Sequence, residues 1–246
     1  MLRSLMLSVL AAALGAHAQP WRFVGAEPGR PGPVVKGAPF SADITTETSM
    51  VLQDGNRIHQ VSKLRFYRDG EGRTRREQSL NSLGALASNT NLPPVIFISD
   101  PVAGVNYALS PASKTANKSL SGGRGPMGRG RMRGGPPLPD RQQNTKTESL
   151  GTKTLEGVTA EGTRTTITIP AGQEGNEQPM LTVIESWYSP DLQIAVLSKR
   201  SDPRYGETVT RYSNISRGEP AHSLFEVPAD YKIETPPVRG PRTGAK

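Results

Sequence analysis

The chain contains no cysteine, and this absence removes several classes of site at once. Disulfide bridges, thiolate metal sites, cysteine nucleophiles and an acylated N-terminal cysteine are all excluded. Aromatic residues make up only 5% of the 246 residues, and hydrophobic residues only 34%. This apolar share is low for a single compact domain of that length. Part of the chain is therefore expected to lie outside any hydrophobic core.

Long apolar runs are also absent, apart from a short one near the N-terminus. Leu5–Leu14 follows Arg3 and precedes Ala16-His17-Ala18. This order is typical of a cleavable secretory signal, here residues 1–18, with a mature chain that starts at Gln19. A buried or membrane-spanning helix is the alternative, but a span needs about 20 apolar residues. The sequence thus predicts a soluble exported protein, periplasmic or secreted, that is not a lipoprotein.

The net charge of +8 is unevenly distributed along the chain. Residues 113–146 hold eight Lys and Arg against one Asp, whereas residues 38–112 and 147–234 together hold 20 acidic and 15 basic residues. Nucleic acid is therefore not an expected partner, because the basic charge is not on the folded part. The Gly and Pro content predicts a flexible leader at 19–37, a β domain at 38–234, a disordered Gly/Arg/Pro-rich insertion at 119–143 and a disordered tail at 235–246.

Short β-rich runs alternate with turn signals through the folded part. Asp54-Gly55-Asn56 predicts a hairpin turn, Val95–Ile98 predicts a strand covered on both faces, and Leu80–Ser88 predicts one short helix. The strands are expected at residues 42–52, 57–68, 73–78, 95–98, 105–109, 148–155, 158–169, 180–188, 192–199, 205–215 and 224–227. This pattern predicts a mainly β fold with little helix: a single curved antiparallel sheet or open (half) β-barrel of about ten strands.

Three segments in the last third of the chain share a pattern with a known family. They are Glu185–Leu197 (ESWYSPDLQIAVL), Tyr205–Ile215 (YGETVTRYSNI) and Ser223–Ile233 (SLFEVPADYKI). Residues 180–233 resemble the C-terminal half of LolA-type periplasmic lipoprotein carriers and the wider outer-membrane lipoprotein-sorting superfamily. The resemblance implies an open barrel that carries a lipid or a lipoprotein. The proline-rich residues 19–37 depart from the family, whose carriers open with an amphipathic helix.

A curved sheet needs its concave face filled by side chains, a helix or a ligand. Strand alternation places a set of apolar side chains on that face, where they would line a ligand site or, alternatively, fill a closed core. The predicted lining residues are Leu64, Phe66, Phe97, Ile167, Ile184, Ile194 and Val196.

The Gly/Arg-rich insertion offers a second candidate contact. Arg124, Arg129, Arg131 and Arg133 would bind an anionic membrane or lipopolysaccharide weakly, at about 1 kcal/mol for each arginine. The alternative is a solvated insertion between two strands, whose deletion would leave thermal stability nearly unchanged.

Catalytic and metal-binding signals are weak. The two histidines of the mature chain, His59 and His222, lack metal-ligand spacing and are expected at the surface, with a catalytic base as the alternative. We predict no catalytic residue, no metal and no cofactor. In Arg73–Glu77, Arg73 and Arg75 share one face and Arg76 the other. Ion pairs are expected there, and the alternative is a contact between one arginine and a ligand carboxylate or phosphate.

Trp187 and Tyr188 end one of the predicted strands. We expect core packing and an edge cap from them, with a sugar-stacking platform as the alternative. The leading functional hypothesis is a non-enzymatic exported binding protein that holds a lipid, an acyl chain or a lipoprotein on its concave face. The alternatives are an envelope sensor or protein-interaction module with a filled barrel and, third, a hydrolase with a non-standard site.

Overall fold

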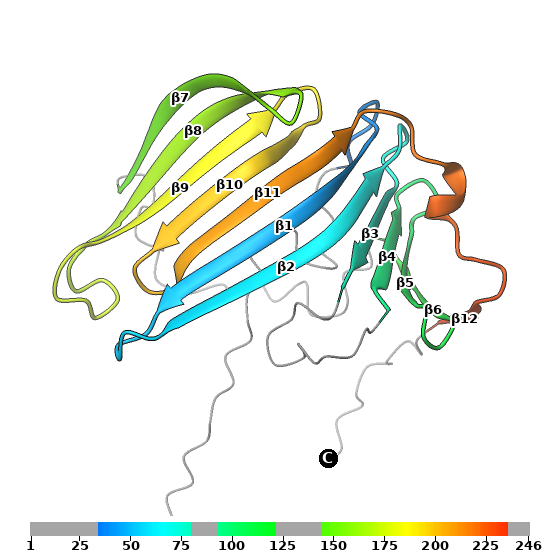
Figure 1. Cartoon of the computed structure of the whole chain (residues 1–246), viewed down its shortest axis with the longest axis horizontal. Coiled ribbons are helices and arrows are strands. Elements are labelled where there is room, and N and C mark those ends of the chain that lie inside the picture. Colours follow the sequence, from blue (N-terminus) through cyan, green and yellow to red (C-terminus); the bar gives the residue numbers. More distant parts are fainter. Residues whose placement is uncertain (1–33, 80–92, 122–143, 236–246) are drawn as a thin grey trace, which may run out of the picture.

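The computed structural model describes residues 34–79, 93–121 and 144–235, and these form one sheet of twelve strands. The order across the sheet is β12-β6-β5-β4-β3-β2-β1-β11-β10-β9-β8-β7 (Figure 1). The elements are β1 (Phe40–Val51), β2 (Arg57–Arg68), β3 (Thr74–Gln78), β4 (Val95–Asp100), β5 (Val105–Ser110), β6 (Thr115–Leu120), β7 (Thr145–Leu155), β8 (Val158–Ile169), β9 (Met180–Ser189), β10 (Ile194–Asp202), β11 (Gly206–Ser216), the 3₁₀ turn η3 (His222–Phe225) and β12 (Lys232–Glu234).

The predicted fold class is confirmed, because the sheet is open, curved and almost free of helix. Two predicted strands, β2 and β8, have the bounds that their alternation indicates. The turn that leads into β2 forms as expected: Gly55 has a φ of 81°, and the Asn56 amide donates to Asp54 Oδ1 at 2.9 Å. No helix in the described part of the chain has the length and apolarity needed to cross a membrane.

Three elements differ from the sequence prediction. Residues 224–227 were expected to form a strand. Leu224 and Phe225 instead belong to η3, the next two residues follow it, and Phe225 packs into a hydrophobic core cluster. Strand β6 was not predicted, and its last two residues, Ser119 and Leu120, had been assigned to the insertion. Strand β12 was not predicted, and it pairs with β6 in parallel, so the sheet is not wholly antiparallel. The predicted helix at 80–88 lies outside the described residues.

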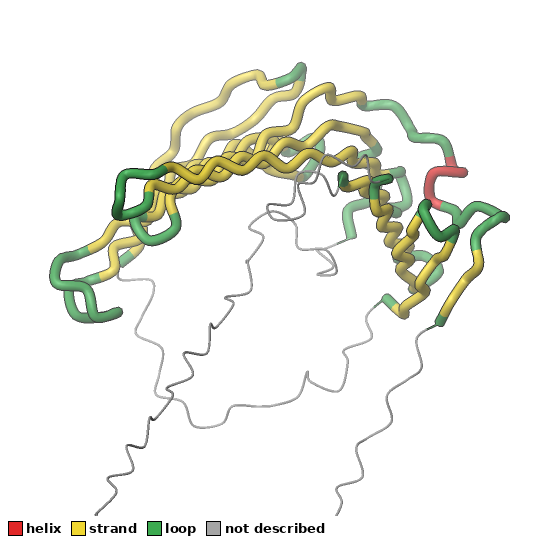
Figure 2. Tube along the Cα trace, turned by 60° about the horizontal axis from the view of Figure 1, so that its bottom comes forward, coloured by secondary structure: helices red, strands yellow, loops and turns green. Residues whose placement is uncertain are grey.

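The sheet bends into an arch, which gives it an inner and an outer face (Figure 2). Facing residues of neighbouring strands lie on the same side of a sheet, so the strand registers assign each side chain to a face. The outer face carries Ile96, Ile98 and Leu109, which pack against Phe225 of η3. The inner face carries Phe40 and Ala42, which belong to a second core cluster.

That second cluster lies where the first residues of β1 meet the turn between β9 and β10. Its buried members are Phe40, Ala42, Val158, Ala160, Leu192 and Val196. Phe40 is fully buried and its ring centroid lies 5.4 Å from that of Phe66. The arch is thus held at both ends by apolar contacts, one cluster on the β3–β6 side and the other on the β8–β11 side.

The connection from β6 to β7 joins opposite parts of the sheet. In the strand order, β6 is next to the edge strand β12, whereas β7 is the other edge, ten strand steps away. At about 4.8 Å per step, these strands are roughly 48 Å apart along the sheet. Ser121 and Asn144 therefore cannot be joined directly in this strand order. Deletion of the segment between them is now expected to disrupt the sheet, not to leave thermal stability nearly unchanged.

Candidate functional site

Arg76 lies on the inner face between two aromatic side chains. It is paired with Phe66 of β2 on one side and with Phe97 of β4 on the other. Burial lowers the pKa of the Arg76 guanidinium below its ordinary value. A charge in such a half-buried setting attracts an opposite charge more strongly than it would in water. The neighbouring residue Arg75 points to the outer face, where it contacts Glu77 at 2.7 Å.

Arg68 is a second cation on the same face and is only 4% exposed. Its guanidinium donates to the Ala38 carbonyl at 2.9 and 2.7 Å and also to the Leu192 carbonyl. It lies 4.7 Å from the centroid of the Phe40 ring. Burial lowers its pKa as well. Its described partners are carbonyls and a ring, so this buried charge is not neutralised by a carboxylate in the described part of the chain.

Tyr212 of β11 lies near both arginines and beside apolar side chains of the inner face. It faces Ile44 of β1, which in turn faces Leu64 of β2. Burial raises the pKa of the Tyr212 phenol, and the charges of Arg76 and Arg68 oppose that rise. The phenol therefore stays protonated at neutral pH and offers a hydrogen-bond donor beside the two guanidinium groups. We call Leu64, Phe66, Arg68, Arg76, Phe97 and Tyr212 the inner patch.

A continuous row of hydroxyl side chains crosses the inner face next to this patch. The registers align one Ser or Thr from each of seven neighbouring strands, from β2 through β1, β11, β10, β9 and β8 to β7. The row consists of Ser62, Thr46, Thr210, Ser198, Ser186, Thr163 and Ser149. Thr46 and Thr210 are within hydrogen-bond distance at 3.1 Å. The inner face is therefore divided into an apolar, cationic part and a polar band.

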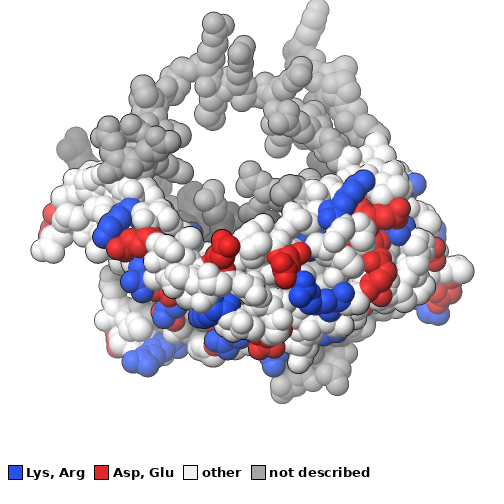
Figure 3. All heavy atoms as spheres, turned by 90° about the horizontal axis from the view of Figure 1, so that it is seen from above, with Lys and Arg blue, Asp and Glu red and all other residues white. Residues whose placement is uncertain are grey.

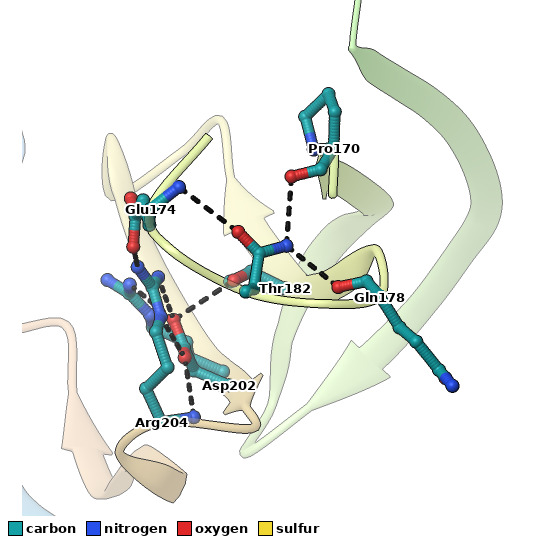
Figure 4. A network of polar contacts seen from close by, with 8 residues as sticks. Pro170, Glu174, Gln178, Thr182, Asp202 and Arg204 are labelled. Atoms are coloured by element: carbon teal, nitrogen blue, oxygen red, sulfur yellow. Dashed lines mark hydrogen bonds and ion pairs between the residues drawn. The ribbon is translucent and has the colours of Figure 1, made fainter. Parts of the chain in front are cut away.

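Beyond the hydroxyl row, a buried carboxylate organises the turn between β10 and β11 (Figure 4). Asp202 accepts hydrogen bonds from Thr182 Oγ1 at 2.9 Å and from Arg204 Nε and Nη2 at 2.9 and 2.8 Å. These donors, led by Arg204, hold the pKa of Asp202 far below its ordinary range. Arg204 also contacts Glu174 in the β8–β9 loop, so the network fixes that loop to the sheet.

The seven predicted lining residues do not form one surface. Leu64, Phe66 and Phe97 come together in the inner patch. Ile167 and Ile184 share the inner face but lie beyond the hydroxyl row, where Ile184 faces Arg200 and Thr165.

Strict alternation fails at Ile194, one of the two predicted lining residues of β10. The register of β10 shifts between Ala195 and Leu197, so Val196 is an extra, bulged residue. This shift pairs Ile194 with Ser189, on the side of Trp187, and it leaves Val196 only 1% exposed in a core cluster. Ile194 therefore does not lie on the inner face as predicted, whereas Val196, next to the outward-facing Leu197, lies on the inner side with Phe40 and Ala42.

The four arginines predicted to meet an anionic surface, Arg124, Arg129, Arg131 and Arg133, lie outside the described residues. The same holds for the predicted signal peptide and for most of the leader and the tail. Those assignments remain predictions.

Both histidines are exposed and contact charged groups. His59 lies 4.0 Å from Glu47, and His222 lies 3.1 Å from Glu226 and 2.8 Å from Arg73. These contacts do not create the imidazole–hydroxyl pair that a serine-type hydrolase requires. Across residues 34–79, 93–121 and 144–235, no three His, Cys, Asp or Glu side chains come close enough together to hold a metal ion.

Sequence reasoning missed Arg68 and the hydroxyl row. Arg68 ends a predicted strand, where a basic residue normally signals solvent, and only the tertiary contacts with Ala38 and Leu192 show its burial. The row depends on the mutual register of seven strands, which a single sequence does not reveal. The alternating threonines Thr46 and Thr48, matched by Thr208 and Thr210, were a weak local signal of it.

Neither a protein-family model nor a curated protein matches the sequence. Several solved structures are similar to the chain at low identity. The MucA/MucB complex of Pseudomonas aeruginosa matches with a TM-score of 0.42 and 10% identity, over 81% of this chain and 59% of that one. A LolA superfamily protein from Nitrosomonas europaea matches with a TM-score of 0.34 and 7% identity, over 78% and 91% of the two chains.

The lipoprotein LppX of Mycobacterium tuberculosis matches with a TM-score of 0.32 and 11% identity, over 73% of this chain and 88% of that one. The chain thus spans about three fifths of the length of the MucB structures that it matches. The LolA superfamily, which residues 180–233 resemble, is among the solved folds to which this chain is similar.

Proposed function

We propose that this chain is an exported binding protein whose inner patch holds an anionic amphiphile, such as a fatty acid or an acidic phospholipid. The observation that carries the proposal is the position of Arg76, a half-buried cation flanked by Phe66 and Phe97. A ligand that has both an acyl chain and a carboxylate or phosphate can contact the aromatic side chains with the first and Arg76 with the second.

The roles of the side chains follow from their places in the patch. Leu64, Phe66 and Phe97 would pack against the acyl chain, and each buried methylene group contributes about 0.8 kcal/mol. Arg76 would bind the headgroup by charge-assisted hydrogen bonds, which planar guanidinium groups form well with carboxylates and phosphates. Tyr212 would donate a further hydrogen bond from its protonated phenol.

Binding of oleate and of phosphatidylglycerol by the purified mature protein tests this function. Native mass spectrometry gives the stoichiometry, and titration calorimetry gives the affinity. We expect Arg76→Met to weaken binding about tenfold or more, since it removes a charge-assisted hydrogen bond. Arg75→Met is the matched control, because the adjacent arginine faces outward and is paired with Glu77. Equal affinity of the Arg76→Met variant and the wild type would refute the role of Arg76.

A protein ligand is the second candidate, and the hydroxyl row favours it. A polar band seven strands wide can hydrogen-bond to the backbone of an extended peptide, whereas it offers an acyl chain little. Protein isolated from its own envelope separates the two candidates. A lipid adduct in the native mass spectrum supports the lipid role. A bare mass, together with no uptake of added lipid, leaves the peptide-binding role.

A further inference from the structure

The outer face carries a groove that is separate from the inner patch. It has a volume of about 370 Å³ and lies over strands β9, β10 and β11, beside the β7 residue Lys153. Its apolar surface comes from Trp187, Leu197 and Val209. Trp187 and Arg211 both pair with Leu197, from opposite sides, so these three side chains stand in one row across the groove.

The position of Trp187 depends on a glycine in the neighbouring strand. Gly162 of β8 pairs with Trp187, and a Cβ atom at that position would lie 2.7 Å from Cη2 and Cζ3 of the indole. A side chain there would push the ring away, so Gly162 lets the indole lie against the sheet. The ammonium group of Lys153 lies 3.5 Å from the indole centroid. The groove thus has an aromatic platform with a cation above it.

The charges of the groove leave a net positive surface. The two acidic lining residues already have partners, Glu185 with Arg164 at 2.7 Å and Glu207 with Lys199 at 2.9 Å. Lys153 and Arg211 have no carboxylate within ion-pair distance among the described residues. Both are exposed, on opposite sides of the apolar surface. The groove therefore favours a small ligand that carries a negative charge.

The spacing of these groups suits one sugar ring. Two strand steps of about 4.8 Å separate the backbones of Trp187 and Arg211, a span of roughly 10 Å. The C–H groups on one face of a pyranose pack well on an indole, and a guanidinium binds a carboxylate or a phosphate in two-pronged fashion. We propose that the outer groove binds an anionic sugar, a pyranose that carries a carboxylate or phosphate group.

In this arrangement the sugar ring takes the place of the Lys153 ammonium on Trp187, and Lys153 and Arg211 bind the anionic group. The proposal is independent of the lipid function, because the groove and the inner patch lie on opposite faces and share no residue. A negative result in the test of one proposal does not contradict the other.

Intrinsic fluorescence provides the test, since the chain has only two tryptophans. Trp21→Phe makes Trp187 the single reporter in the full mature protein. Glucuronate and glucose 6-phosphate are the anionic probes, and glucose and acetate are the controls for the sugar ring and for the charge. We expect at least one anionic sugar to give a saturable change in emission, with an affinity about tenfold or more above that for either control.

Variants of exposed side chains locate the site without disturbing the core. Lys153→Met and Arg211→Gln should each weaken binding of the anionic sugar about tenfold, and Lys63→Met, on the same face outside the groove, should leave it unchanged. Equal binding of glucose, equal binding of acetate, or no saturable change with either anionic sugar would overturn the proposal. Binding of an acidic peptide in the groove, with no binding of the sugars, would overturn it in favour of a protein partner.

Discussion

The inner and outer faces of the same twelve strands carry different chemistry. In the space-filling view, Lys and Arg lie close to Asp and Glu over the side of the molecule that is seen (Figure 3). Charged pairs of this kind occur on the outer face. Arg65 pairs there with Asp43 at 2.9 Å, and the side chains are 32% and 42% exposed. Three residues further along β2, on the inner face, Arg68 is buried and hydrogen-bonds to two backbone carbonyls.

This difference indicates which face is adapted to a ligand. Surface ion pairs need no partner beyond each other, and they contribute little to stability. Arg68 has no neutralising carboxylate among the described residues, and a buried cation of this kind costs stability and is often retained for a function. The charged side chains of the outer face are therefore mostly paired with one another, and the burial of Arg68 on the inner face supports the proposal that an anionic ligand binds there.

The largest expected effect concerns the connection that joins the two ends of the arch. Deleting residues 122–143 should abolish the cooperative unfolding transition, because β6 and β7 then cannot both keep their places in the sheet. Replacing the same 22 residues by a Gly/Ser linker of equal length should restore the transition. Circular dichroism during thermal unfolding measures both variants. A deletion variant as stable as the wild type would contradict the strand order.

The next largest effect compares an inner with an outer side chain of β1. Phe40→Ala should lower the free energy of unfolding by about 3–5 kcal/mol, because it leaves a cavity among Phe66, Tyr212 and Arg68. Val51→Ala, at a position that is 61% exposed, should change it by less than about 0.5 kcal/mol. Urea denaturation gives both values, and similar losses would show that the inner face is not packed as described.

The buried carboxylate predicts a dependence on pH. Asp202→Asn should destabilise the protein by about 2–3 kcal/mol at neutral pH, because Arg204 loses its buried anionic partner. The pKa of Asp202 is lowered on folding, so its stabilisation is fully present above the unfolded pKa of about 3.9. It is lost as the pH falls below that value. The difference in the free energy of unfolding between the wild type and the Asp202→Asn variant should therefore be constant above about pH 5 and become smaller at lower pH.

The smallest expected effect sharpens the contrast between the two arginines of β2. Arg65→Met should change the free energy of unfolding by less than about 1 kcal/mol. Arg68→Met should cost about 2 kcal/mol, because it leaves the buried carbonyls of Ala38 and Leu192 without their donor. A loss for Arg65→Met as large as that for Arg68→Met would remove the energetic distinction between the faces.

The sequence predicted the parts of the fold that depend on local patterns. Strands β2 and β8 alternate clearly, and the turn at Gly55 requires a residue that accepts positive φ, so their bounds could be predicted. Strand β6 was missed because its residues are mostly exposed and polar, with only Ala116 fully buried. The edge pairing of β12 depends on a contact with β6 far away in sequence, which no local pattern indicates.

The candidate site was predictable only in part, for the same reason. Alternation within single strands placed Leu64, Phe66 and Phe97 together correctly. It failed at Ile194, because a bulge at Val196 inserts one residue and reverses the face of Ile194. The order of strands across the sheet, which separates Ile167 and Ile184 from the inner patch, follows from tertiary structure alone.

Binding of an anionic amphiphile to the inner face, and not to the outer one, can be tested directly because the chain contains no cysteine. Leu64→Cys and Lys63→Cys place a thiol on adjacent residues of β2 that face inward and outward, respectively. Each is labelled with an environment-sensitive fluorophore and titrated with oleate. The inner-face proposal predicts a saturable blue shift of emission at residue 64 and no shift at residue 63. Equal shifts at both positions, or a shift at residue 63 alone, would contradict it.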